Sequence, residues 1–84
     1  MSENIYELEV RAVCPVTAGL VDRYEVTVRS SATIPVEAIL ECFKKYQGTQ
    51  VFQETMTQEA ATVLGAQVET VGFHAGVKVR CIAP

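Results

Sequence analysis

The stretch of residues 13–22 contains the two side chains whose types and spacing best suit chemistry in this sequence. Cys14 is followed directly by Pro15, and Asp22 lies at the end of the same stretch. A thiolate is a strong nucleophile, and a nearby carboxyl group can protonate an atom that gains electrons during the attack. Such a pair could add to an electrophilic carbon. The alternative interpretation is that Cys14 is a small buried apolar side chain and Asp22 an ordinary turn residue.

Two predicted strands flank this stretch. Residues 5–13 and residues 23–30 alternate between apolar and polar side chains, which is typical of half-buried strands. We expect the two strands to pair as an antiparallel hairpin. Its connection, residues 13–22, is several times longer than the two residues that a hairpin can use. Long loops held by rigid strands are where proteins often place reactive groups.

A first helix is predicted after the hairpin. Pro35 suits the first helical position, because its fixed backbone angle matches the helix and its missing N–H costs nothing there. Gly48 can adopt the left-handed conformation that ends a helix. Apolar residues at helical spacing predict the buried face, namely Val36, Ile39, Leu40 and Phe43.

A second helix is predicted between Thr49, a suitable N-cap, and Gly65, which would end it. Its apolar positions follow the same spacing and are Phe52, Met56, Ala60, Val63 and Leu64. Two further strands are expected over residues 67–74 and 76–83, joined by a tight turn.

The predicted order of elements is β-β-α-α-β-β, an α+β fold in a single domain over residues 1–84. Two helices can cover one face of a four-stranded antiparallel sheet. A domain of this size buries only a modest part of its surface, and the outer strands leave open edges. We therefore expect several copies to pair along these edges into a closed β-barrel, as a homo-oligomer.

Charge and hydropathy exclude some classes of function. A net charge of −3, from 7 basic and 10 acidic residues, argues against broad electrostatic binding of nucleic acid. An oligomer could still gather basic side chains of the strands on one surface, namely Arg11, Arg23, Arg29, Lys78 and Arg80. No apolar run approaches the length of a membrane span, so no membrane partner is expected.

The three cysteines do not form a paired pattern. An odd number without paired spacing, together with the absence of a signal peptide, predicts a reducing, cytoplasmic location. Cys42 and Cys81 fall on the apolar sides of their elements and are interpreted as packing residues. No spacing among the cysteines and His74 matches a metal site, so no metal is expected.

Cys14-Pro15-Val16-Thr17, followed by Asp22, is similar to the nucleophile loop of the QueF family. Those enzymes act on the nitrile of 7-cyano-7-deazaguanine. The β-β-α-α-β-β order likewise resembles the tunnelling fold (T-fold) to which that family belongs. Phe52-Gln53-Glu54 is similar to the substrate motif of the family, which has a histidine where this chain has Gln53. The resemblance covers the chain from about residue 8 to residue 82.

The resemblance implies one of two chemistries, both beginning with a thioimide on Cys14. Reductases of the family use NADPH to convert the nitrile to an aminomethyl group, whereas the shorter QueF-like amidinotransferases add ammonia to it on tRNA. The Ser/Lys-rich NADPH motif is absent from residues 37–44, and the run 21–26 is similar to the shorter branch. Amidine formation without a cofactor is therefore expected, with an NADPH-dependent nitrile reductase as the alternative.

The resemblance also implies a role for each candidate site residue. Cys14 would be the nucleophile and Asp22 the acid/base, although one more residue separates them than in the family. Glu54 would anchor a purine-like small molecule or a modified tRNA base, because a carboxylate can accept both adjacent N–H donors of such a ring. Gln53 could bind a base edge, and His74 could replace the missing histidine, in a site between subunits. Alternatively, Glu54, Gln53 and His74 are surface residues, and the chain is a non-catalytic purine- or pterin-binding T-fold protein.

Overall fold

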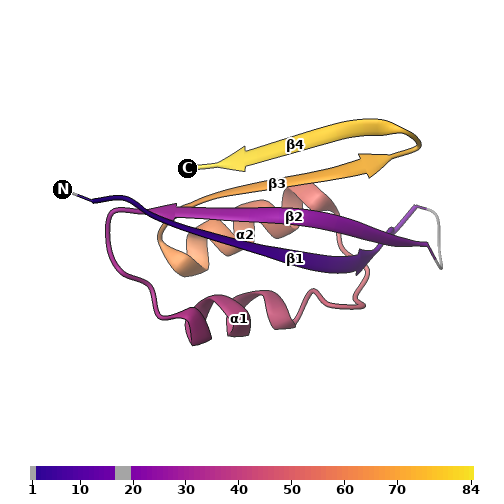
Figure 1. Ribbon diagram of the computed structural model, residues 1–84. Helices are drawn as coiled ribbons and strands as arrows, with labels where there is room; N and C mark the ends of the chain where they lie inside the picture. Colours follow the sequence, from indigo (N-terminus) through magenta and orange to yellow (C-terminus); the bar gives the residue numbers. More distant parts are fainter. Residues whose placement is uncertain (1, 17–19) are drawn as a thin grey trace.

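Four antiparallel strands form a single sheet, and two helices cover one of its faces (Figure 1). The computed structural model describes residues 2–16 and 20–84. The sheet order is β1-β2-β3-β4. The predicted order of elements and the predicted sheet are confirmed. The elements are β1 (Asn4–Val13), β2 (Val21–Ser30), α1 (Val36–Lys44), α2 (Gln53–Leu64), β3 (Gln67–His74) and β4 (Val77–Ala83).

The β1–β2 hairpin extends farther than the predicted strands. Val13 pairs with Val21, and Ala12 pairs with Asp22. Asp22 therefore lies in β2 and not in the connection, and its interpretation as an ordinary turn residue is wrong. Side chains alternate along a strand, so Asp22 shares the helix-facing side of the sheet with Tyr24.

The core lies between the sheet and the helices. Its largest fully buried side chains include Tyr24 from β2, Phe43 from α1 and Met56 from α2. Tyr24 is only 1% exposed. The smaller buried apolar side chains of the strands are Val10, Ala12, Val26, Val28, Val68 and Ala83. The inward alternation predicted for the first two strands is confirmed at Val10, Ala12, Tyr24, Val26 and Val28.

The chain that connects α1 to α2 runs beside the end of β1 and forms hydrogen bonds with it. The Val13 N–H donates to the Thr49 carbonyl at 3.0 Å, and the Val51 N–H donates to the Val13 carbonyl at 3.3 Å. Thr49 is therefore bound to β1, and the N-cap of α2 is Phe52. The prediction that Thr49 caps the second helix is wrong, because pairing with the strand takes its place.

Of the other predicted helix boundaries, the end of α2 is confirmed, whereas both ends of α1 differ from the prediction. Pro35 is the N-cap of α1 rather than its first residue, and the helix ends at Lys44. Gly48 has a left-handed backbone with φ +68°, but it lies in the turn beyond the helix end. Gly65 is the left-handed C-cap of α2, as predicted.

Several apolar helix positions predicted to be buried are exposed. α1 buries Ile39, Cys42 and Phe43, whereas more than half of the surface of Val36 and Leu40 is exposed. Only the stripe of α1 that carries Ile39, Cys42 and Phe43 reaches the core. Phe52, the N-cap of α2, and Val63 within α2 are also exposed. No helix within residues 2–16 and 20–84 is long and apolar enough to cross a membrane.

Tyr46, in the turn after α1, is expected to make the fold sensitive to alkaline pH. It is 3% exposed, and its hydroxyl donates to Oε1 of Glu59 at 2.7 Å. Burial, and then this hydrogen bond, hold the pKa of Tyr46 far above its usual range. Above about pH 10 the unfolded chain releases this proton while the folded chain keeps it, so the free energy of unfolding falls as the pH rises.

The Tyr46→Phe variant should lack this contribution, which is at most about 1.4 kcal/mol per pH unit for one proton. Urea unfolding of both proteins at several values between pH 8 and pH 11 measures the slope. The wild type should lose stability more steeply above pH 10 than Tyr46→Phe. Parallel curves would contradict the assignment of the proton to Tyr46.

Candidate functional site

The candidate site lies at the end of the sheet where β1 and β3 finish and β2 and β4 begin (Figure 1). The start of α2 reaches the same end. The hydrogen bonds between residues 49–51 and Val13 hold it there, because they attach the chain just before α2 to the last residue of β1. Segments far apart in the sequence thus bring their polar side chains together.

Asp22, Tyr24 and His74 form one group. The Tyr24 hydroxyl donates to Oδ2 of Asp22 at 3.3 Å and lies 3.5 Å from Nε2 of His74. His74 Nδ1 is 3.7 Å from the same Asp22 oxygen. The Tyr24 and His74 rings are tilted against each other, with centroids 5.9 Å apart. The carboxylate predicted to act as acid/base therefore contacts both an imidazole and a phenol.

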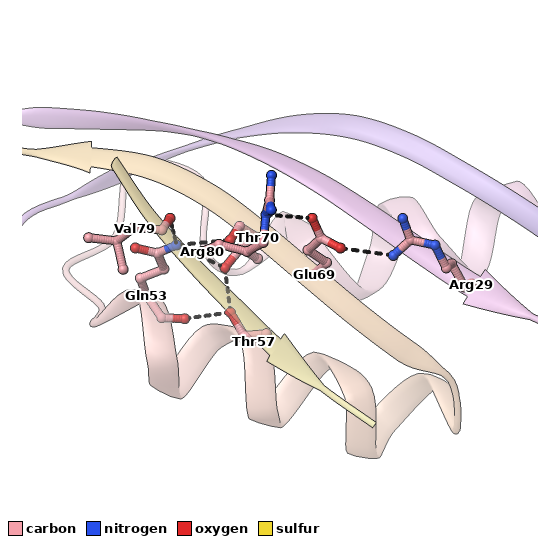
Figure 2. A network of polar contacts seen from close by, with 7 residues as sticks. All are labelled: Arg29, Gln53, Thr57, Glu69, Thr70, Val79 and Arg80. Carbon is pink, nitrogen blue, oxygen red and sulfur yellow. Dashed lines mark hydrogen bonds and ion pairs between the residues drawn. The ribbon is translucent and has the colours of Figure 1, made fainter. Parts of the chain in front are cut away.

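Gln53 links this group to buried residues of the protein interior, and Figure 2 shows its contacts with Thr70 and Val79. It is 5% exposed, and its Nε2 lies within hydrogen-bond distance of the Thr70 carbonyl (3.1 Å), the Thr70 hydroxyl (3.2 Å) and the Val79 carbonyl (3.0 Å). Its Oε1 is 2.9 Å from Nε2 of His74. Gln53 is therefore buried, and the interpretation of it as a surface residue is wrong.

Two buried threonines complete the network. The Thr57 hydroxyl donates to the Gln53 carbonyl at 2.7 Å and lies 2.6 Å from the Thr70 hydroxyl. Both threonines are at most 1% exposed. Of the described residues, no buried side-chain nitrogen or oxygen lacks a hydrogen-bond partner. A network satisfied in this way is rigid and fixes the geometry of its members.

Cys14 follows β1 directly and is half-buried. Its N–H donates to the Leu20 carbonyl at 3.0 Å, so the two ends of the connection are tied together. Burial, then the Asp22 charge and hydrogen bond, and then the charges of Cys14 and Cys81 hold the pKa of Tyr24 far above its usual range. Both thiols thus lie within electrostatic reach of the Tyr24 hydroxyl. Of the proposed nucleophile motif, Thr17 lies outside the described residues.

A hollow of about 490 Å³ opens beside this network. Glu54, from the first turn of α2, lines it together with Cys81 of β4 and both Gln53 and His74. Burial, and secondarily the Glu54 charge, raise the pKa of the Cys81 thiol. Cys81 is only half-buried, so its interpretation as a pure packing residue is incomplete. Cys42 is buried in the core, as expected.

The structure thus places His74 in contact with both Asp22 and Gln53, and it places Glu54 in a hollow with His74 and Gln53. The sequence interpretation missed Tyr24 and Thr70 as members of the site. The alternation of β2 could have indicated Tyr24, because it faces the same side as Asp22. No group of three potential ligand side chains among residues 2–16 and 20–84 could hold a metal ion.

The opposite face of the sheet carries mixed charge. Glu9 pairs with Arg11 and Arg23, each at 3.1 Å. Glu69 pairs with Arg29 at 2.9 Å and Arg80 at 3.0 Å across three strands (Figure 2). The basic residues that an oligomer was expected to gather therefore already share one face of a single chain. Acidic partners accompany the four arginines, so the face is not a uniformly basic surface.

Comparison with known proteins supports the fold. No family model and no curated protein matches the sequence. Among solved structures, the archaeosine synthase QueF-Like in its apo form matches with a TM-score of 0.83 and 20% sequence identity, covering 99% of this chain and 92% of that chain. The chain therefore has the T-fold, as the order of its elements predicted.

Proposed function

We propose that the chain is a QueF-like enzyme that acts on the nitrile of a 7-cyano-7-deazaguanine-type base through a thioimide on Cys14. One observation carries this proposal. Asp22 and His74 contact Tyr24, Gln53 contacts His74, and Cys14 lies within electrostatic reach of Tyr24, on the fold of a protein described as an archaeosine synthase.

The reaction needs a nucleophile and a proton donor. The Cys14 sulfur bonds to the nitrile carbon, one carbon–nitrogen π bond breaks, and its electron pair takes a proton from Asp22. The proton given up by the thiol restores the carboxyl group, so the addition is balanced. Ammonia then attacks the thioimide carbon, and the sulfur leaves with a proton. The product is an amidine, and no oxidant or reductant is consumed.

Glu54 is proposed to hold the ring of the substrate. It lies in the first turn of α2, where the helix dipole favours a negative charge. It lines the hollow that also contains Gln53 and His74, and His74 in turn contacts Asp22. A carboxylate at this place can accept two hydrogen bonds from adjacent N–H groups of a purine-like ring, which would fix the ring's orientation.

The partners proposed for this site are a purine-like small molecule or a modified tRNA base, and further copies of the chain. β1 and β4 form the two edges of the sheet. Unpaired strand edges can accept a strand of another copy, so a closed barrel of several copies is the proposed assembly. Sites between subunits would follow, because the end of β1 and the start of β4 both border the candidate site.

Product analysis tests this function and separates it from the alternatives. We expect the nitrile, supplied as the free base or within RNA, to be converted to the amidine when ammonia is present, without oxidation of NADPH. Oxidation of NADPH that depends on the nitrile would instead indicate the reductase. Tight binding of the base with no product under either condition would indicate a binding protein and would contradict the proposal.

A further inference from the structure

The hydrogen bonds of the buried network have a single consistent direction (Figure 2). The Thr57 hydroxyl donates its hydrogen to the Gln53 carbonyl. In the 2.6 Å contact between the two threonine hydroxyls, Thr70 must therefore be the donor. The Thr70 oxygen is then free to accept a hydrogen bond from Nε2 of Gln53. Every hydrogen in this part of the network is placed.

This direction fixes the orientation of the Gln53 amide. Its NH₂ group faces two backbone carbonyls and one hydroxyl, all at 3.0–3.2 Å. A flipped amide would place its oxygen against both carbonyls, where oxygen cannot donate. The amide oxygen must therefore face His74 Nε2 at 2.9 Å, and only a nitrogen that carries a hydrogen can satisfy it. The network thus requires a hydrogen on Nε2 of His74.

The other imidazole nitrogen consequently faces Asp22. Nδ1 lies 3.7 Å from Oδ2 of Asp22, and the Tyr24 hydroxyl donates to the same oxygen. The 3.7 Å separation is just beyond hydrogen-bond distance, and Nδ1 is the imidazole nitrogen through which His74 can exchange a proton with the carboxyl group. A tautomer with its hydrogen on Nδ1 alone would leave the Gln53 oxygen opposite a lone pair.

We propose that Gln53 and His74 are positioning residues that together keep a proton available to Asp22. Gln53 fixes the tautomer of His74, and His74 exchanges the proton with Asp22 through Nδ1. This inference rests on the proposed function, in which Asp22 gives a proton to the nitrile nitrogen. When Asp22 releases that proton, Nδ1 can supply it again, and the proton from the thiol later returns to the pair. No other reactant is required.

The tautomer can be measured directly, because His74 is the only histidine of the chain. A long-range proton–nitrogen NMR spectrum of uniformly ¹⁵N-labelled protein reports which imidazole nitrogen carries the hydrogen. We expect Nε2 to be protonated in the wild type. In Gln53→Met the acceptor is lost, and the hydrogen should shift toward Nδ1, where Asp22 accepts it. Gln50→Met is the matched control, since Gln50 is exposed and outside the network, and it should keep the wild-type spectrum.

Each outcome of this measurement decides the inference. A wild-type spectrum with a hydrogen on Nδ1 and none on Nε2 would overturn it, as would a folded Gln53→Met with an unchanged tautomer. If Gln53→Met does not fold, the wild type and Asp22→Asn remain decisive. Asp22→Asn keeps the Gln53 oxygen in place, so Nε2 should still carry its hydrogen.

A kinetic test addresses the effect on chemistry. We expect His74→Gln to slow formation of the Cys14 adduct with 7-cyano-7-deazaguanine by about 100-fold, the lower end of the usual contribution of a side chain that transfers a proton. Adding Asp22→Asn to His74→Gln should cost no more than Asp22→Asn alone, because the two groups act as a unit. If the rate losses of His74→Gln and Asp22→Asn were additive in the double variant, the two residues would not act as a unit, and the inference would be overturned. Absence of any adduct on the wild type would instead refute the proposed function, while the tautomer result would stand.

Discussion

Gly72→Ala is expected to destabilise the fold by about 1–3 kcal/mol, the usual cost of overfilling a packed core. A Cβ at position 72 would lie 2.6 Å from two ring atoms of Tyr24, closer than real Cβ contacts occur. The ring cannot move freely, because Tyr24 is 1% exposed and its hydroxyl donates to Asp22. Chemical unfolding of Gly72→Ala and the wild type under the same conditions measures the loss.

A double-mutant cycle is the proper control for this prediction. The other described glycines, Gly48, Gly65 and Gly76, have open space where a Cβ would lie but positive φ, so alanine would be strained there for a different reason. In a Tyr24→Leu background the ring is gone, and Gly72→Ala should cost much less than in the wild type. If the two changes were simply additive, the contact between ring and glycine would not be the cause.

Cys14→Ala is expected to abolish covalent capture of 7-cyano-7-deazaguanine. The two other thiols are poor substitutes, because burial raises the pKa of both Cys42 and Cys81 and leaves little thiolate near neutral pH. Intact-mass analysis after incubation without ammonia should show one bound nitrile per chain in the wild type and none in Cys14→Ala. Cys42→Ala, which removes a thiol far from the proposed chemistry, should retain the adduct. Equal labelling of the wild type and Cys14→Ala would contradict the proposed role.

The strands were the most predictable part of the fold. Alternation alone identified the inward side of β1 and β2, because the two faces of a half-buried sheet differ sharply in polarity. The helix faces were less predictable. Helical spacing groups Leu40 with Ile39 and Phe43, but the stripe that reaches the core depends on how α1 lies against its neighbours. Thr49 was misassigned for the same reason, since its pairing with β1 is a tertiary contact.

The candidate site was predictable in its residue types but not in its contacts. Cys14 and Asp22 stand out by chemistry, and the family resemblance adds Gln53 and Glu54. The contact between Gln53 and His74 joins two elements that no local pattern connects. By the resemblance, Gln53 stands where the QueF family has a histidine. In the structure its Oε1 lies 2.9 Å from Nε2 of His74, the single histidine of the sequence, a contact that only the folded arrangement reveals.

The most direct test of the proposed function is a crystal structure of the protein soaked with 7-cyano-7-deazaguanine in the absence of ammonia. We expect continuous density between Cys14 Sγ and the former nitrile carbon, with the imide nitrogen directed at Asp22 and the ring edge bound by Glu54. A ring bound elsewhere, or a ring in this hollow with an intact nitrile and no bond to Cys14, would contradict the account.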